Sequence, residues 1–181
     1  MSGRKEPPSR AKFEKALFEL LNEHPFSSIS VSDICRKAGL SRQSFYLSYR
    51  DIDDVLAHVI MRLFNDIMNS VEVHNVDSSE KLIAEYTNIV EAHAEEFKAL
   101  ADREMSGKLG AVLVEELVQH PTMPGCNREI IEPTEKYYFN AFWVAGFVEV
   151  YTKWLSEDMK TDKNELNRIL LDIMSGQYFK K

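Results

Sequence analysis

Cysteine is scarce in this chain: Cys35 and Cys126 are the only two among 181 residues. Two cysteines cannot build a disulfide scaffold, and they are too few for a cysteine-based zinc site. The five histidines show no metal-ligand spacing such as H-x-x-x-H. We therefore expect no metal and no cofactor, and we expect a reducing cytoplasm as the location.

Long apolar runs are missing too. No stretch approaches the roughly 18 apolar residues that cross a bilayer, and residues 1–10 lack the apolar segment of a secretory signal. We therefore expect no membrane partner. No glycine-rich phosphate loop, nucleophile elbow or pair of catalytic carboxylates stands out either. An enzyme is thus a poor hypothesis, because it would need a polar cluster that only a folded pocket brings together.

Charge is distributed unevenly along the chain. Residues 1–50 carry nine Lys/Arg and five Asp/Glu (+4), whereas residues 51–181 carry thirteen and twenty-four (−11), which together give −7. A basic head on an acidic body is typical of a DNA-binding domain joined to a second domain. Hydrophobic residues make up 44% and charged residues 28% of the chain, which favours a folded globular protein.

Apolar residues recur at helical spacing, and no segment alternates as a strand does. The predicted fold is all-α, with a three-helix helix-turn-helix DNA-binding domain followed by a helical ligand-binding and dimerisation domain. We expect a flexible arm over residues 1–8, the first domain over 9–50 and the second over 51–181. The predicted helices cover residues 9–23, 31–38, 41–47, 51–70, 80–101, 108–119, 135–157 and 163–174, with a connector at 74–79 and a loop at 121–126. The helix at 51–70, about 30 Å long, would connect the domains.

Several residues mark where the first helices begin and end. Ser30 and Asp33 have the spacing of a capping box, and Gly39 can adopt the left-handed conformation that turns the chain. Ser9 and Ser41 can cap the first and third helices. Three short helices with a glycine turn before the third form a helix-turn-helix, whose third helix enters the major groove of DNA.

The segment at residues 29–56, ISVSDICRKAGLSRQSFYLSYRDIDDVL, resembles the signature of the TetR family of transcriptional regulators. The shared elements are I-x-V-x-D-I in the second helix, A-G-L-S in the turn, S-F-Y in the third helix, and an aromatic residue before an acidic helix start. With the first helix, the resemblance covers about residues 9–60. It implies a homodimeric repressor that a small-molecule effector releases from a near-palindromic DNA operator.

The resemblance also implies roles for individual residues. Arg42, Gln43 and Ser44 are expected to read bases, since Arg can form two hydrogen bonds with guanine and Gln with adenine. Leu47 is expected to meet a thymine methyl group, and Phe45 to anchor the helix in the core. The expected phosphate contacts are Lys12, Ser32, Arg36, Lys37, Tyr46, Ser48 and Arg50.

Two positions depart from the family pattern, which usually has histidine at position 48 and lysine at position 52. This chain has Ser48 and Ile52, and isoleucine cannot bond a phosphate. Weaker DNA binding would follow, unless Arg50 substitutes from the neighbouring turn. An alternative function is therefore a TetR-like co-regulator that acts mainly through protein–protein interaction.

Two further surfaces are implied in residues 51–181. The first is a pocket for a small apolar or amphipathic effector, lined by Phe64, Met68, Tyr86, Phe97, Met105, Phe142 and Trp143. The second is a dimer interface on the last two helices, formed by Tyr138, Gly146, Val150, Trp154, Ile169 and Ile173. Plain core packing explains the aromatic and methionine residues equally well, and a buried helix in a monomer is the alternative to the dimer.

Overall fold

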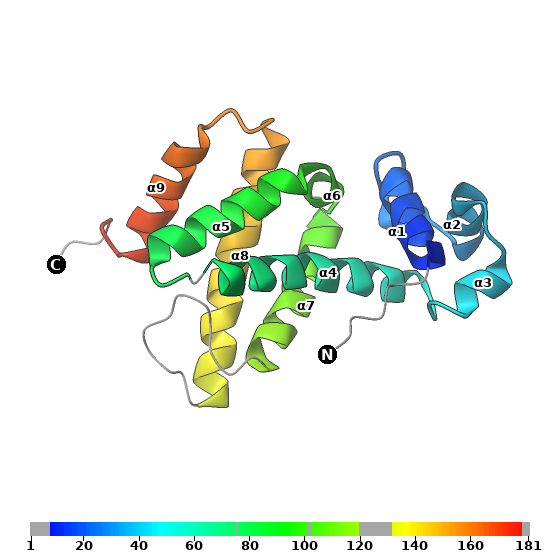
Figure 1. The fold of residues 1–181 in the computed structure, drawn as a ribbon, viewed down its shortest axis with the longest axis horizontal. Helices are drawn as coiled ribbons and strands as arrows, with labels where there is room; N and C mark the ends of the chain where they lie inside the picture. The colour runs from blue at the N-terminus through cyan, green and yellow to red at the C-terminus, as the bar shows by residue number, and fades with distance from the viewer. Residues whose placement is uncertain (1–7, 75, 101–102, 120–131, 179–181) are drawn as a thin grey trace. The chain divides into compact units, whose positions relative to one another are not determined.

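The computed structural model describes residues 8–74, 76–100, 103–119 and 132–178 (Figure 1). Every regular element in these ranges is a helix, which confirms the predicted all-α fold. The elements are α1 (Pro8–Leu21), the 3-10 helix η1 (Phe26–Ser28), α2 (Val31–Ala38), α3 (Arg42–Tyr46), α4 (Ile52–Val73), α5 (Ser79–Ala92), α6 (Ala94–Ala99), α7 (Arg103–Gln119), α8 (Pro133–Ser156) and α9 (Lys163–Met174). The predicted loop at 121–126, with Cys126, and the predicted arm up to residue 7 lie outside the described residues.

The chain divides into two compact units, Met1–Arg62 and Leu63–Lys181. The division falls inside α4, so the first half of this helix belongs to the first unit and its second half to the other. The predicted domain limits at residues 8 and 50 stay predictions.

In the first unit, α1 packs on α2 and α2 packs on α3. The predicted apolar stripe of α1 faces this core, since Phe13 and Leu17 are fully buried. Ile34 of α2 and Phe45 of α3 are also fully buried, and the rings of Phe13 and Phe45 meet edge to face at 5.2 Å between centroids. Aromatic pairs of this geometry stabilise a core beyond the area they bury, so α3 is fixed to the body of the unit.

Two predicted helix boundaries in this part of the chain were wrong by a few residues. The first helix begins at Pro8, so Ser9 lies in its first turn and is not its cap. Proline fits there because the first helical residues need no N–H donor. The fourth helix runs on to Val73 rather than ending at Ser70, and the apolar Val71 of the added turn is buried.

In the second unit, α7 lies along α8 and α5 lies along α9, while α6 also contacts α8 (Figure 1). The predicted single helix at 80–101 was wrong, because the chain breaks at His93 into α5 and α6. His93 has φ −111° and ψ 29°, outside the α-helical region, and its Nδ1 lies 2.9 Å from Glu96 Oε2. Val90 and Phe97 pack against the same core on either side of the break, so the apolar periodicity continues through it and conceals it.

The helix predicted at 108–119 begins earlier, at Arg103. Gly107 and Gly110 lie inside it, and glycine is a poor helix former, which weakens the sequence signal. Packing against α8 outweighs this local preference.

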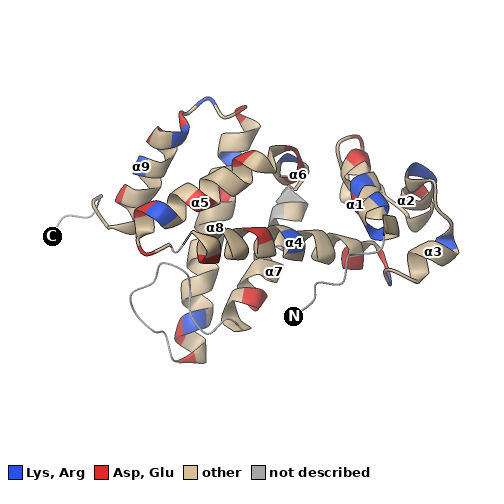
Figure 2. Cartoon of the chain, viewed as in Figure 1, with Lys and Arg blue, Asp and Glu red and all other residues tan. Residues whose placement is uncertain are grey.

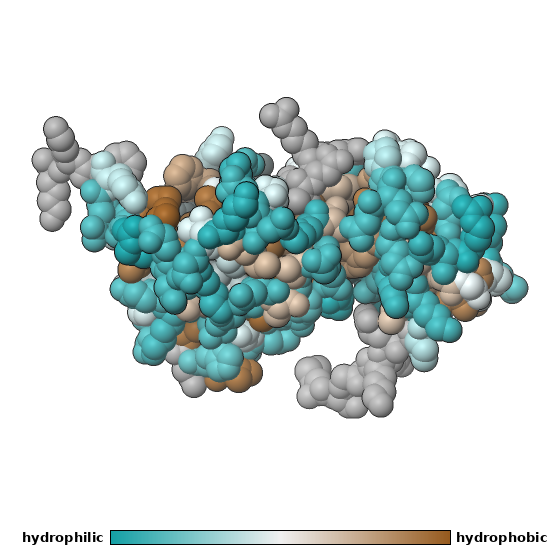
Figure 3. Space-filling view, turned by 90° about the horizontal axis from the view of Figure 1, so that it is seen from above, coloured by the Kyte–Doolittle hydropathy of each residue, from teal (hydrophilic) through white to brown (hydrophobic). Residues whose placement is uncertain are grey.

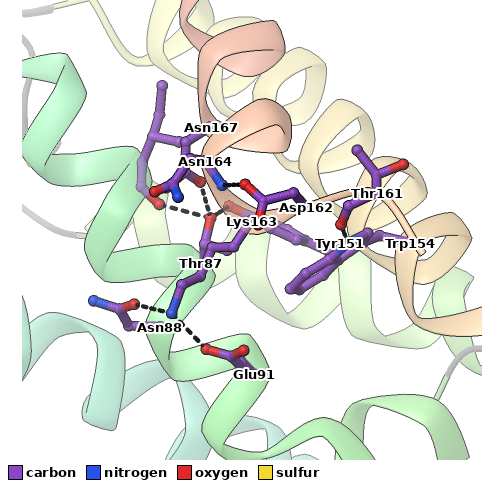
Figure 4. A network of polar contacts seen from close by, with 11 residues as sticks. Thr87, Asn88, Glu91, Tyr151, Trp154, Thr161, Asp162, Lys163, Asn164 and Asn167 are labelled. Carbon is purple, nitrogen blue, oxygen red and sulfur yellow. Dashed lines mark hydrogen bonds and ion pairs between the residues drawn. The ribbon is translucent and has the colours of Figure 1, made fainter. Parts of the chain in front are cut away.

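A buried polar network joins three helices of the second unit (Figure 4). The Thr87 hydroxyl of α5 lies 2.9 Å from the Ile83 carbonyl oxygen, 2.9 Å from the Tyr151 hydroxyl of α8 and 2.5 Å from Asn167 Oδ1 of α9. Burial raises the pKa of Tyr151 well above its usual range, so its hydroxyl keeps its proton and can donate to Thr87. The network fixes α9 to α5 and α8.

Candidate DNA-binding surface and ligand cavity

The turn between α2 and α3 is built as the sequence predicts. The Ser30 side chain accepts a hydrogen bond from the Asp33 N–H (3.2 Å), and the Ser30 N–H donates to Asp33 Oδ2 (3.0 Å), which completes the capping box. These bonds from Ser30 hold the pKa of Asp33 below its usual value. Gly39 ends α2 with φ +66°, the left-handed conformation that favours glycine.

The short helix α3 presents its polar residues to solvent. Ser41 caps it by accepting from the Ser44 N–H at 3.1 Å. Because Phe45 is buried, Arg42, Gln43 and the C-terminal Leu47 point away from the core, and Leu47 is 82% exposed. Of the four expected base-reading residues, Ser44 is the least accessible: it is half-buried and its hydroxyl lies 3.0 Å from that of Ser41.

The expected phosphate-binding residues lie around this helix, with Lys12, Ser32, Tyr46 and Arg50 exposed and Ser48 half-buried. Three of the expected phosphate-binding cations, Arg36, Lys37 and Arg50, form ion pairs with acidic residues. Figure 2 shows acidic residues among the Lys and Arg of this unit. The pairs are Arg36–Asp33, Lys37–Glu19, Lys37–Glu23 and Arg50–Asp54. Exposed pairs of this kind are worth little, so a phosphate can compete for each cation.

Arg10 is a residue that the sequence interpretation missed. Its guanidinium donates to the Ser48 carbonyl oxygen at 3.2 Å, lies 2.7 Å from His58 Nε2 and sits over the Tyr49 ring, 5.3 Å from the centroid. It therefore holds the turn that follows α3 against α1 and α4. No local pattern reveals it, because its partners lie 38 to 48 positions away.

The second unit contains a partly open cavity of about 110 Å³. Of the seven residues expected in an effector pocket, the cavity is lined by Phe64, Met68, Tyr86, Phe97 and Trp143. Phe142 and Met105 do not line it: Phe142 is 70% exposed, and Met105 is buried elsewhere in the core. Phe142 precedes the cavity-lining Val144 by two positions, or about 200° around a helix, so it points outward.

The residues expected at a dimer interface fall into different environments. Tyr138, Gly146 and Ile173 are exposed, whereas Val150 and Ile169 are half-buried. Trp154 does not belong to this surface: it is 4% exposed and its Nε1 donates to the Thr161 carbonyl oxygen at 2.8 Å. The apolar periodicity of α8 continues around the helix, so sequence alone did not distinguish this core residue from the outer face.

The described residues offer neither a metal site nor a membrane span. They contain no group of three or more His, Cys, Asp or Glu residues that could hold a metal ion. No helix in the described part is long and apolar enough to cross a membrane.

Residues 15–59 match the family model described as bacterial regulatory proteins of the TetR family, and residues 112–176 match one described as a transcriptional regulator C-terminal region. Solved structures agree in fold. The fatty acid degradation regulator FadR from Bacillus halodurans has a TM-score of 0.62 at 18% identity, covering 93% of this chain and 97% of its own. A TetR transcriptional regulator from Streptococcus agalactiae 2603V has a TM-score of 0.62 at 19% identity, covering 91% and 92%.

A third solved structure was determined with a ligand. FadR from Bacillus subtilis, in complex with stearoyl-CoA, has a TM-score of 0.58 at 15% identity, covering 90% of this chain and 96% of its own. At such low identity the likeness concerns the fold. Both family models match this chain, and the structure has the helix-turn-helix with an outward-facing α3. The chain therefore belongs to the TetR family of DNA-binding transcriptional regulators.

Proposed function

We propose that the protein is a homodimeric repressor whose α3 helices read the bases of a near-palindromic operator. The observation that carries this proposal is the outward-facing set Arg42, Gln43 and Leu47 on a helix anchored by the buried Phe45. Arg42 would bond guanine and Gln43 adenine, each through two hydrogen bonds in the major groove. Leu47 would contact a thymine methyl, and Ser44 would contribute from the start of α3.

The remaining polar residues around α3 would hold the DNA backbone. Tyr46 and Ser32 offer hydroxyl groups and Lys12 an exposed ammonium group, while Arg36, Lys37 and Arg50 would exchange their acidic partners for phosphates. Such contacts fix the register of the protein without reading sequence. Ser48 can add one hydrogen bond.

Dimerisation would use the outer face of α8 together with α9. Tyr138 and Phe142, one turn apart, are 69% and 70% exposed, and Ile173 of α9 is 41% exposed. The space-filling view shows hydrophobic residues at the surface in separate areas (Figure 3). Beside this face, α7 and α8 form a groove of about 630 Å³ whose lining includes the small residues Gly107, Gly110, Ala111, Ala141 and Ala145. Small residues would allow the helices of a second copy to approach closely.

An effector would bind in the 110 Å³ cavity of the second unit. A ligand that binds one arrangement of the dimer better than another shifts the population toward it. We propose that the ligand-bound arrangement no longer matches the operator half-sites, so that the protein leaves the DNA in the cytoplasm where it acts.

The experiment that tests this function is selection of bound duplexes from a random-sequence pool. The expected result is a near-palindrome whose half-sites are about 10 base pairs apart, or a multiple of this, as two α3 helices in a symmetric dimer require. A single half-site would contradict the dimer. Absence of any enriched sequence would contradict base reading.

A co-regulator that works mainly through protein–protein contacts is the second candidate. Ile52, the first residue of α4, offers phosphate no hydrogen bond, and three of the expected cations are paired with acids. Binding to bulk duplex DNA measured from 50 to 200 mM salt distinguishes the two. A regulator loses affinity steeply as salt rises, whereas the co-regulator would show almost no binding at either end of the range.

A further inference from the structure

Asn140 of α8 is a buried amide that bonds to no other residue in the described part of the chain. Its side chain is 0% exposed, and neither Nδ2 nor Oδ1 has a hydrogen-bond partner among the described residues. Buried polar groups are nearly always paired, because an unpaired one loses its hydration and gains nothing in return. Such a residue in a native fold calls for an explanation.

Asn140 is not itself among the residues that line the cavity of the second unit, but it lies next to them along α8. It precedes Trp143 and Val144 by one helical turn on the same face of α8, and both of these residues line the cavity. Leu113 and Leu117 of the neighbouring α7 line it as well. The amide therefore lies at the N-terminal end of the α8 face that lines the cavity.

The cavity itself offers a ligand almost only hydrocarbon. Its described lining consists of aromatic and aliphatic side chains with one threonine and two tyrosines, and contains no charged residue. The hydroxyl of one of these tyrosines, Tyr151, is already bonded to Thr87. A buried carboxylate or phosphate here would have no cation to offset its desolvation.

We propose that Asn140 binds the polar end of the effector, and that the effector is a compact, uncharged molecule with an apolar body and one group that both donates and accepts hydrogen bonds. This inference rests on the proposed effector function of the cavity. A carboxamide, lactam or similar group satisfies both atoms of the asparagine side chain at once. The 110 Å³ of the cavity is less than the roughly 150 Å³ of a cavity that binds benzene, so one aromatic ring is the upper limit for the apolar body.

Three probes of similar size separate the possibilities: benzamide (uncharged, donor and acceptor), toluene (no polar group) and benzoate (anionic). Their binding to the full-length protein is measured by calorimetry and by tryptophan fluorescence, since Trp143, one of the two tryptophans, lines the cavity. Wild type is expected to bind benzamide at least tenfold more tightly than toluene or benzoate. Equal or reversed preference in the wild type overturns the proposal.

Asn140→Leu is the main variant, and exposed Asn65→Leu on α4 is its matched control. Asn140→Leu is expected to lose at least tenfold in benzamide affinity, to keep or gain affinity for toluene, and to unfold at a higher temperature than wild type. Asn140→Ala, which adds no bulk, is expected to lose benzamide binding in the same way. Asn65→Leu is expected to behave as wild type.

Unchanged benzamide affinity in Asn140→Leu or Asn140→Ala overturns the proposal. A lower unfolding temperature for Asn140→Leu also overturns it, because that result would mean that the amide has partners in the folded protein. Operator binding by the wild type without probe tests the regulator function separately. Failure of that binding would overturn the proposed function, whereas intact binding with no benzamide preference would overturn only the role of Asn140.

Discussion

Tyr46, the last residue of α3, and Tyr49, which lies after the helix, are three positions apart, yet their surroundings differ completely. Tyr49 is 3% exposed, and its hydroxyl donates to Glu14 Oε1 at 2.9 Å. Glu14 is itself buried, and Arg62 Nε lies 3.4 Å from its other oxygen. Tyr46 is 54% exposed and faces the region where DNA is proposed to bind.

Replacing Tyr49 with Phe should therefore cost stability, because it leaves a buried carboxylate with one donor fewer. A hydrogen bond to a charged group contributes about 1.5–3 kcal/mol, and we expect the free energy of unfolding in urea to fall by about 2 kcal/mol. Tyr46→Phe is the matched control, with an expected change below about 0.5 kcal/mol. If Tyr46→Phe proved the more destabilising of the two, the placement of these rings would be wrong.

At the scale of residues, the sequence predicts neighbours along one helix better than partners from distant segments. The buried Phe45 and the exposed Arg42 follow from helical spacing and the family resemblance. Arg10 and Asn140 could not be predicted in the same way. The contacts of Arg10 join α1 to segments 38 and 48 positions away. That Asn140 has no hydrogen-bond partner among the residues the structure describes is visible only in the folded chain.

Gly39 controls the angle between α2 and α3 through its backbone alone. A Cβ added to it would meet nothing within 4 Å, so a substitution there costs backbone strain at φ +66° rather than a clash.

We expect Gly39→Ala to lower the free energy of unfolding by about 1–2 kcal/mol, and Gly39→Asn to cost less, because asparagine tolerates the left-handed region. Thermal unfolding of both variants measures this. Equal stability of Gly39→Ala and wild type would show that the turn relaxes to another conformation.

The Thr87–Tyr151 contact couples α5 to α8. Tyr151→Phe and Thr87→Val should each destabilise the second unit by about 1 kcal/mol, and the double variant should cost less than the sum, with a coupling of about 1 kcal/mol. Urea unfolding of the four proteins measures the coupling, and Tyr178→Phe, with an exposed ring, is the control. Additive costs would mean that the two hydroxyls do not bond.

At the scale of elements, type and order could be predicted from periodicity and caps, whereas some boundaries could not. The capping box at Ser30 and the glycine at Gly39 are local chemistry, so α2 and its turn were predicted correctly. The break at His93 has no proline or glycine to mark it. The glycines inside α7 predict a helix break, although the chain is helical there. In both places tertiary packing decides the outcome.

At the scale of the whole molecule, the proposed dimer depends on the exposed aromatic face of α8. Phe142→Asp places a charge on that face and should convert dimers to monomers in sedimentation equilibrium. Because a monomer binds only one half-site, operator affinity should also fall at least tenfold.

Val73→Asp is the control for this variant, since Val73 is 72% exposed at the end of α4. It should stay dimeric and keep its operator affinity. If the Phe142→Asp variant remained dimeric, the dimer interface would have to lie on another surface. Without the family resemblance, the dimer and the effector could not be predicted from the sequence, because each depends on contacts with a second molecule.

That α3 reads operator bases is tested most directly by equilibrium titration of wild type and Arg42→Ala with the selected operator and its single-base variants. Arg42→Ala should bind the operator about 1–3 kcal/mol more weakly, about 5- to 150-fold, and should lose discrimination at one base pair in each half-site. Arg36→Ala, a proposed phosphate contact, should weaken binding to all sequences alike. Wild-type affinity and selectivity in Arg42→Ala would contradict base reading by α3.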